Sequence, residues 1–453
     1  MIIGIILQSA IQRRLFRHYG ESLILDWTHN TNNLGFHLGC LLATSVTGKG
    51  LPVLDFLCLS QGVDMMRSVL EVFVEGSEDA LDVVESFVID KDYKEWKAVN
   101  TVFARAAVVL CQFHVLKWFK TVVADARHEI PKNARPVVLK LVRQMMYSES
   151  REDLLRHKAQ LLSLLPLSTH DRFQTYMDKR WYSCQSMWAN YVRGKVFTAG
   201  NTTSNRLESH WNQFKAALGK RRRIDHCVEM IFIRATTILR RELAEITSST
   251  AKTRLLRNEH EFMREVLHDL SITRAELVKH EWKKYQSRFR RFYCPSGVED
   301  DGTCAVFPSR LSGVRFVVSA LDDQYWTCTC RFASSSRLPC RHQLFVAKNV
   351  KGFASFPVRA LARRWRLSAA EDLLEHLEES VESLARMRLA KVVERRAMGV
   401  PCVDVVVKLP TRKKTVVYRQ LHRFERANCV VLGDIEKRNI VEAQCERVVE
   451  RLM

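Results

Sequence analysis

The sequence predicts an α/β fold, and the order of its apolar segments carries that prediction. Three segments with strand character follow one another at short spacings, at residues 22–27, 35–46 and 53–59. Spacings this short favour an antiparallel meander. Two further segments of the kind that forms buried strands then alternate with helical stretches, at residues 86–89 and 106–110. A meander followed by alternating helices and strands is the layout of an RNase H-like core.

Helices are expected where apolar residues recur at helical spacing, over residues 63–74 and about 112–126. Another helix is expected to begin at Asp92, because Asp92 and Glu95 have the spacing of an N-cap and an acidic first turn. Between residues 131 and 200 the strand signals disappear, while leucine, arginine and tryptophan recur at helical spacing. We therefore expect an all-helical insertion there.

The predicted core domain spans residues 7–245, and three further segments follow it. Residues 246–300 are expected to form a helical connector, and residues 310–350 a small ββα zinc finger. Residues 351–453 are expected to form a basic, mostly helical tail, with a charged helix at 368–396 and one candidate strand, VDVVVKLP.

Composition and charge indicate a polyanionic partner. The 453 residues carry a formal net charge of +21, and the pI is about 9.6. A balance this basic favours nucleic acid, so DNA is the expected partner. Residues 21–114 contain 6 Lys/Arg and 13 Asp/Glu, a net of −7, whereas residues 115–245 contain 24 and 12, a net of +12. Either the basic segment docks phosphates beside an acidic, metal-holding block, or these are two solvated surfaces.

The apolar segments argue against a membrane and against secretion. No apolar run reaches the ~18–20 residues that span a bilayer, so no membrane association is expected. The first seven residues are apolar, but no basic region precedes them and they run into Arg13 and Arg14, unlike a signal peptide. The 13 cysteines should then stay reduced, and clustered ones indicate metal ligands before disulfides. The expected location is nuclear, or else cytoplasmic.

Three acids stand at the ends of predicted elements: Asp26, Asp90 and Glu208. Asp26 and Asp90 end strands, and Glu208 lies in the first turn of a helix expected over residues 206–218. Three carboxylates at one end of a sheet could hold two Mg²⁺ or Mn²⁺ ions for phosphodiester chemistry. Each acid also has a structural interpretation. Glu208 has capping spacing to Asn205, Asp90 suits a turn, and Asp26 could cap the loop that follows it.

A second cluster has the spacing of a zinc site, Cys-x-Cys-x9-Cys-x-His, and consists of Cys328, Cys330, Cys340 and His342. Strands at residues 314–320 and 325–330 would place two cysteines on a hairpin, and a helix after Pro339 would carry the other two ligands. Such a set closes a tetrahedron, so the zinc would be structural, and losing a ligand would unfold only this module. The alternative is chance clustering among the cysteines.

Several segments resemble the Mutator-like (MULE) transposases, in the expected order. They cover about residues 7–218 and are LILDWTHNTNNLGFHLGCLLATSVTGKGLPVLDFLCLS, SFVIDKDYKEWKAV, VVLCQFHVLKWFK and NTTSNRLESHWNQFK. A later segment, CTCRFASSSRLPCRH, resembles the SWIM zinc-finger motif. The chain is therefore most similar to SWIM-finger proteins that carry a transposase-derived core.

The resemblance implies that Asp26, Asp90 and Glu208 are the catalytic acids of a DDE-type transposase. It also matches Cys111 and His114 to a Cys-x-x-His motif between the second and third acids. From the residues alone, we expect this pair to pack structurally, with a role in positioning DNA as the alternative. Such transposases carry an N-terminal zinc module, whereas the acid-bearing domain here begins close to the first residue. We therefore expect either a truncated gene product or a copy that has lost this module.

Two functions remain as hypotheses. The first is a zinc- and DNA-binding enzyme of DNA transposition, and the second is a domesticated, catalytically inactive regulator that binds DNA or protein. Protein partners would bind at the SWIM finger or the C-terminal helices. A basic run could contact a DNA backbone, act as a nuclear import signal, or be a solvated helix end; it consists of Lys220, Arg221, Arg222 and Arg223.

Overall fold

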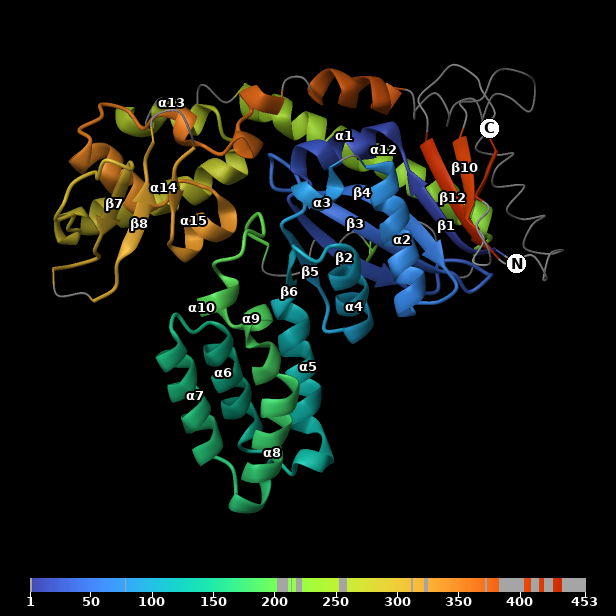
Figure 1. The fold of residues 1–453 in the computed structure, drawn as a ribbon, viewed down its shortest axis with the longest axis horizontal. Coiled ribbons are helices and arrows are strands. Elements are labelled where there is room, and N and C mark those ends of the chain that lie inside the picture. Colours follow the sequence, from blue (N-terminus) through green and yellow to red (C-terminus); the bar gives the residue numbers. More distant parts are fainter. Residues whose placement is uncertain are drawn as a thin grey trace.

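The computed structural model describes residues 2–77, 79–201, 211–212, 214–216, 222–251, 259–310, 313–321, 325–370, 373–382, 403–408, 415–418 and 427–433. These residues form a large mixed sheet covered by helices, a helical projection and a second, smaller sheet (Figure 1). No helix among them is both long and apolar enough to cross a bilayer.

The large sheet is built around the predicted core, with strand order β11-β10-β12-β1-β4-β3-β2-β5-β6. The antiparallel meander consists of β2 (Ser22–Thr28), β3 (His37–Thr44) and β4 (Gly50–Cys58). Two parallel strands continue the sheet beside β2, namely β5 (Ser86–Ile89) and β6 (Ala107–Leu110). The predicted RNase H-like core is therefore confirmed.

The N-terminal segment adds a strand that the sequence analysis missed. β1 (Ile2–Gln8) pairs antiparallel with β4, and α1 (Ala10–Tyr19) follows it. The sheet therefore includes residues that precede the predicted boundary at residue 7. Ile5 and Ile6 enter the apolar clusters on opposite faces of the sheet. A strand buried on both faces lacks the alternation of apolar and polar residues by which strands are recognised.

Three strands from the tail extend the sheet beyond β1: β10 (Val403–Lys408), β11 (Thr415–Tyr418) and β12 (Ala427–Gly433). β12 pairs antiparallel with β1, and β10 pairs parallel with β12. The strand expected at VDVVVKLP is present, while β11 and β12 lie where helices were expected. Both contain adjacent valines, and β-branched residues favour strands.

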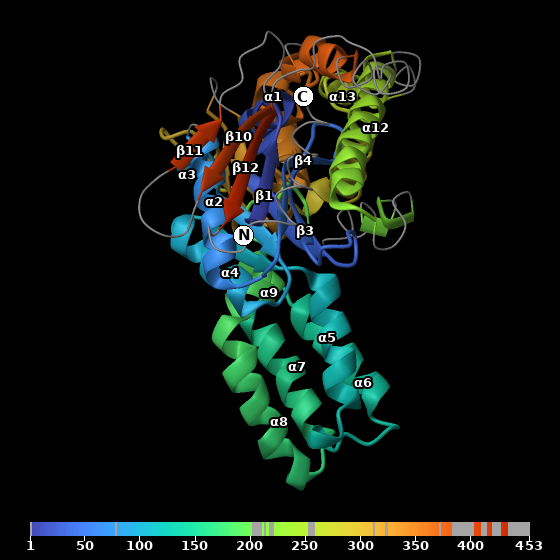
Figure 2. The same ribbon diagram turned by 90° about the vertical axis from the view of Figure 1, so that its right-hand side faces the viewer.

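Helices cover both faces of the large sheet (Figure 2). One face packs against α1, α2 (Val63–Gly76), α4 (Tyr93–Val102) and α5 (Gln112–Ala124), close to where helices were predicted. The other face packs against α12 (Ile224–Thr250). A short helix, α3 (Ala80–Val83), precedes β5.

The insertion projects from the sheet as a bundle of helices, in both views (Figures 1 and 2). It consists of α6 (Arg135–Met146), α7 (Arg151–Ser163), α8 (Leu167–Arg180), α9 (Gln185–Trp188) and α10 (Asn190–Arg193). α5 continues from the sheet into this bundle, where Phe119 packs on Trp181 with ring centroids 4.3 Å apart. The described part of the insertion is all-helical, as predicted.

The finger is larger than predicted. Its sheet has three strands, β7 (Thr303–Val306), β8 (Phe316–Ser319) and β9 (Thr327–Cys328), and the sequence analysis missed β7. Two short helices follow, α15 (Arg331–Ser336) and α16 (Arg341–Phe345), and residues 346–350 extend α16 as a π-helical turn.

The helices before the finger share its core. Phe262 of α13 (Glu261–His268) and Trp282 of α14 (Ile272–Arg288) belong to the same apolar cluster as Val318 and Leu344 of the finger. We call residues 259–366 the finger unit. Residues 246–300 are thus not a separate connector, since α12 includes the first five and the finger unit includes α13 and α14. A small finger buries too little apolar surface to be stable by itself, which explains the shared core.

Buried polar contacts fasten the finger unit to the large sheet. Arg364 is 7 % exposed; its guanidinium donates to the carboxylate of Glu21 and to the Thr44 carbonyl, the latter at 2.8 Å. The carbonyl of Ser335 in α15 accepts hydrogen bonds from the backbone N–H groups of Thr198 and Gly200 at 3.1 and 2.9 Å. The segment that leaves the helical insertion therefore rests on the finger.

Candidate functional site

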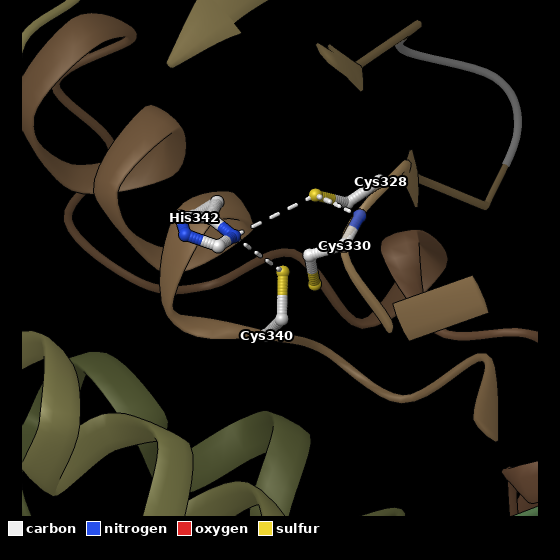
Figure 3. A group of neighbouring side chains, drawn as sticks. All are labelled: Cys328, Cys330, Cys340 and His342. Atoms are coloured by element: carbon white, nitrogen blue, oxygen red, sulfur yellow. Dashed lines mark hydrogen bonds between the residues drawn. The ribbon is translucent and has the colours of Figure 1, made fainter. Parts of the chain in front are cut away.

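The four predicted zinc ligands converge in the finger (Figure 3). Cys328 ends β9, Cys330 is the N-cap of α15, Cys340 is the N-cap of α16, and His342 lies in the first turn of α16. The sulfurs of Cys328 and Cys340 lie 3.7 and 3.8 Å from His342 Nδ1, and all four ligand atoms lie within 4.8 Å of one another. A tetrahedral zinc ion with bonds of about 2.0–2.3 Å separates its ligand atoms by roughly 3.5–3.8 Å, so this geometry fits.

The thiols of this buried site have pKa values that are shifted in opposite directions. Hydrogen bonds from Cys328 and Cys340 hold the pKa of Cys330 far below its usual range, whereas burial raises the pKa of Cys340. Without a cation, one thiolate is favoured at the expense of its neighbours. A zinc ion removes this conflict, because it binds each sulfur as a thiolate. Three sulfurs and one imidazole nitrogen are a common donor set for structural zinc.

Aromatic packing holds the ring of His342. Phe316 stacks on it with centroids 4.2 Å apart and planes at 20°, and Phe292 meets its edge at 5.5 Å. Nδ1 faces the sulfurs, while Nε2 is buried with no hydrogen-bond partner among the described residues. Ring packing therefore fixes an orientation that many metal-binding histidines obtain from a hydrogen bond.

Asp26 and Asp90 belong to neighbouring parallel strands. Asp90 directly follows β5, as predicted, but Asp26 lies within β2, which continues to Thr28, so the prediction that Asp26 ends its strand was wrong. β2 and β5 pair with Ser22 opposite Ser86 and Ile24 opposite Val88, and Asp26 and Asp90 each follow the last of these pairs by two residues. Neighbouring strands lie about 4.8 Å apart. Side chains two positions apart on a strand point to the same face of the sheet, so Asp26 lies on the face of Ile24 and Asp90 on the face of Val88. The structure thus brings two of the three predicted acids together. Glu208 lies outside the described residues.

Asp26 is buried, and both of its carboxylate oxygens accept hydrogen bonds. Oδ1 accepts from the backbone N–H of Trp27 at 2.7 Å, and Oδ2 accepts from the indole N–H of Trp211 at 3.2 Å. Burial, and after it the charge of Asp90, raises the pKa of Asp26 to about 7. Trp211 is three residues beyond Glu208 and was missed by the sequence analysis, because an apolar helix position gave no sign of a hydrogen bond to an acid.

The predicted accessory pair lies beside Asp90. Cys111 directly follows β6 as the N-cap of α5, and His114 Nδ1 lies 2.6 Å from Asp90 Oδ1. Burial lowers the pKa of His114, but hydrogen bonds with Asp90 and Cys111 outweigh it and raise this pKa to about 10. One ligand atom from each of Asp90, Cys111 and His114 lies within 4.8 Å of the others. His114 and Asp90 therefore form a close ion pair, and the charge of each acts on Asp26.

A further carboxylate, Glu95, also lies in this region. It stands in the first turn of α4 and is 6 % exposed, and its Oε2 has no hydrogen-bond partner among the described residues. Burial, followed by the charges of Asp90 and Asp26, raises the pKa of Glu95 well above its usual range. The spacing of Asp92 and Glu95 predicted only a helix start at this position. The one sequence signal for a position near Asp26 and Asp90 was that Glu95 follows Asp90 by five residues.

The predicted basic run is described only in part. Lys220 and Arg221 lie outside the described residues. Arg222 is exposed and its carbonyl accepts a hydrogen bond from Asn33 at 2.7 Å. Arg223 precedes α12 and pairs with Asp225 at 2.9 Å, with its side chain half exposed. A DNA contact by these arginines remains a prediction.

Three family models match parts of the chain. Residues 1–109 match the RNaseH-like domain of zinc finger SWIM domain-containing protein 1/3. Residues 65–253 match a transposase family of the ISL3 DDE type, and residues 320–351 match the SWIM zinc finger. None of the curated proteins matches the chain. The three matches cover strands β1–β6 of the large sheet, the insertion, and residues 320–351 of the finger, and they agree with the predicted resemblance to a transposase joined to a SWIM finger.

Proposed function

Since this chain is a transposase-derived protein with a SWIM zinc finger, we propose that it binds DNA and cuts or transfers DNA strands with divalent cations. The cations would be Mg²⁺ or Mn²⁺, held by Asp26, Asp90 and Glu208. The observation that supports the proposal is that β2 and β5 pair in parallel up to Ile24 and Val88, and Asp26 and Asp90 each follow this pair by two residues. Hard oxygen ligands of this kind suit those cations.

Zinc has a separate, structural role in this proposal. Cys328, Cys330, Cys340 and His342 provide four protein ligands, so no coordination position remains for a substrate. The ion would stabilise the finger unit, which in turn holds Thr198 and Gly200 of the segment that leaves the insertion.

The chain's own residues prepare the acidic site for a cation. The indole N–H of Trp211 and the backbone N–H of Trp27 fix the Asp26 carboxylate, and His114 fixes that of Asp90. Asp26 must lose its proton before it binds a cation, because its pKa is about 7. A bound Mg²⁺ or Mn²⁺ would supply an activated nucleophile and stabilise the leaving oxygen of a phosphodiester.

Helix α5 offers a surface for the DNA backbone next to the acids. It begins beside His114, and its exposed side chains include Phe113, Lys117, Trp118 and Lys120. Exposed lysines interleaved with aromatic side chains are a common surface for nucleic acid, since the lysines neutralise phosphates and the aromatic rings stack on bases. The net charge of +21 favours the same partner.

One observation favours the second hypothesis, a catalytically inactive regulator that binds DNA or protein. Both acids already have partners, since Trp27 and Trp211 donate hydrogen bonds to Asp26, and His114 forms an ion pair with Asp90. Acids held in this way could keep the fold stable without binding a cation.

End-labelled duplex DNA separates the two functions. The zinc-loaded full chain would be incubated with labelled duplexes and Mn²⁺, and binding and strand cleavage would be measured on gels. We expect the wild type to bind and cleave, and both Asp26→Asn and Asp90→Asn to bind without cleaving. Binding without cleavage by the wild type would support the regulator, and no binding by any of the three would refute the proposed function and leave only a regulator that binds protein.

A further inference from the structure

One face of the finger sheet packs on the zinc site. Phe292 and Phe316 contact the ring of His342, and their ring centroids lie 5.5 and 4.2 Å from its centroid. Val306 pairs with Phe316 across β7 and β8 and is fully buried. This face therefore belongs to the zinc site and to the core of the finger unit.

The opposite face of the same strands is open to solvent and carries two aromatic rings. Successive side chains of an extended strand point to opposite faces, so Tyr293, which follows Phe292, and Phe307, which follows Val306, point outward. Their backbones pair through hydrogen bonds of 3.0 and 2.8 Å, and their ring centroids lie 6.4 Å apart. Tyr293 is 38 % exposed and Phe307 is half-buried. β7 and β8 lie on the side of the finger unit that is turned away from the large sheet (Figure 1).

Exposed arginines lie beside these two rings. The guanidinium of Arg310 lies over the ring of Tyr293, with its Cζ 5.2 Å from the centroid. Arg315 directly precedes β8 and is exposed, as are Arg310 and Arg291, which precedes Tyr293 by two residues. Residues 282–298 and 302–320 contain seven Lys/Arg and no Asp or Glu. The aromatic pair therefore lies in a positively charged part of the finger unit.

The acids of this region lie at the other end of β7. Glu299, Asp300 and Asp301 precede its first residue, Thr303, whereas Phe307 follows its last. About 13 Å of strand separates Thr303 from Phe307. Positive charge is therefore concentrated at the end of the sheet that carries the two rings, which suits a polyanionic partner.

The aromatic rings indicate a single strand of nucleic acid. An exposed ring stacks on a base that is unpaired and unstacked, whereas the bases of a duplex already stack on one another. Arginines beside such rings neutralise the phosphates of the same strand. The helix that carries His342, α16, offers little surface to the groove of a duplex, because four of its five residues are buried.

We propose that the outer face of the finger sheet binds single-stranded DNA. This outer face consists of Arg291, Tyr293, Phe307, Arg310 and Arg315. Bases would stack on the two rings, and the three arginines would hold the adjoining phosphates. The choice of DNA over RNA rests on the proposed function, since cleavage frees the ends of DNA strands. Binding at the outer face needs neither the acids nor a divalent cation.

Fluorescence anisotropy of a short, labelled oligothymidylate, titrated with the zinc-loaded full chain without Mg²⁺ or Mn²⁺, tests this inference. Tyr293→Leu removes a ring without changing the charge and should weaken binding by roughly tenfold, whereas Tyr293→Phe keeps the ring and should bind as the wild type does. Arg310→Gln and Arg315→Gln should each weaken binding. Each should also reduce the slope of log affinity against log salt concentration by about 0.7, the value for one phosphate contact on a single strand.

Two control variants lie in the finger unit but outside the outer face. Tyr325→Leu removes an aromatic side chain that is 41 % exposed and precedes β9, whose Thr327 pairs with Ser319 at the opposite end of the sheet. Arg264→Gln removes an exposed charge from α13. Both should bind the oligothymidylate with the affinity and salt slope of the wild type.

The outcomes distinguish this inference from the proposed function. A wild type that does not bind the oligothymidylate, a folded Tyr293→Leu that binds it as the wild type does, or controls that weaken binding equally would each overturn the inference. Tighter binding of an oligouridylate of the same length would overturn the choice of DNA. The proposed function is judged on the labelled duplex, which Tyr293→Leu should still cleave. If the wild type cleaves no duplex but needs Tyr293 to bind the oligothymidylate, the proposed cleavage fails and the inference stands.

Zinc content and thermal unfolding show whether each variant is folded. If Tyr293→Leu loses its zinc, Arg315→Gln takes its place, because Arg315 is exposed and its replacement leaves the aromatic pair intact. Weaker binding with a smaller salt slope in Arg315→Gln would then support the inference. An unchanged affinity and an unchanged slope in this variant would overturn it.

Discussion

The imidazole of His114, in the first turn of α5, lies 2.6 Å from a carboxylate oxygen of Asp90, which directly follows β5. The Cys-x-x-His spacing produces this contact, because Cys111 caps the helix and His114 then lies in its first turn. The pair therefore does more than pack, since it sets the orientation of one of the two neighbouring acids.

The ion pair between His114 and Asp90 should make stability depend on pH. The pKa of His114 is raised from 6.5 to about 10, so the folded state binds its proton more tightly than the unfolded state. The stabilisation is complete below pH 6.5 and is lost as the pH rises through 10. His114→Gln should therefore be less stable than the wild type at pH 6, by roughly 2–3 kcal/mol after discounting for partial exposure, and nearly equal above pH 10.

Urea unfolding of the zinc-loaded protein at pH 6 and pH 10 checks this prediction. His170→Gln is a suitable control, since His170 contacts Asp171 at 3.0 Å on the surface. A stability difference between His114→Gln and the wild type that is the same at both pH values would show that the ion pair is not formed.

Mn²⁺ affinity should fall as the pH drops below 7. Burial and the charge of Asp90 raise the pKa of Asp26 to about 7, and a carboxylate must be ionised to bind a cation. Below this pKa, the affinity should decrease about tenfold for each pH unit. Calorimetric titrations at pH 6 and pH 8 measure the change, and equal affinities at the two values would contradict a role for Asp26 as a ligand.

Loss of one finger ligand should release zinc. We expect Cys340→Ser to lose about one zinc ion per chain, because three remaining ligands leave the tetrahedron open. Elemental analysis of the purified protein measures the metal content. Cys294→Ser serves as the control, since Cys294 lies in the finger unit but outside the ligand cluster. Zinc content that stays unchanged in Cys340→Ser would rule out this site.

Arg364 should contribute strongly to stability. Its buried guanidinium donates to Glu21 and to the Thr44 carbonyl, so Arg364→Gln leaves the acid without its positive partner. Removing one partner of a buried ion pair costs about 3–5 kcal/mol. Arg363→Gln changes an exposed neighbour and should alter stability by less than about 0.5 kcal/mol. Urea unfolding compares the two variants, and equal stabilities would show that Arg364 does not fasten the finger unit.

The parts of the fold that could be predicted from sequence are those with a local signal. The strands at residues 22–27 and 86–89 were placed within one residue, because each is apolar and bounded by turns. β1 and β7 could not be placed in this way. β1 is buried on both faces and shows no alternation, and β7 is four residues long and is defined by its pairing with β8.

The same reasoning explains which site residues could be predicted. Asp26 and Asp90 could be placed together because parallel strands end at the same edge of a sheet. The zinc ligands could be placed because their spacing is specific to a hairpin followed by a helix. Glu95 could not, since its spacing from Asp92 already had a sufficient local explanation. Its burial depends on how α4 packs under the strand ends, and that is a tertiary property.

The shared core of the finger unit and the contact of Arg364 with Glu21 determine how the chain should melt. If the finger unfolds, Phe262 and Trp282 become exposed to solvent, and Glu21 of the large sheet loses its ion-pair partner Arg364. The finger and the sheet should therefore unfold in one cooperative transition. Chelating the zinc would lower the midpoint temperature of that transition without producing a separate transition at lower temperature. The finger would then not unfold independently of the large sheet.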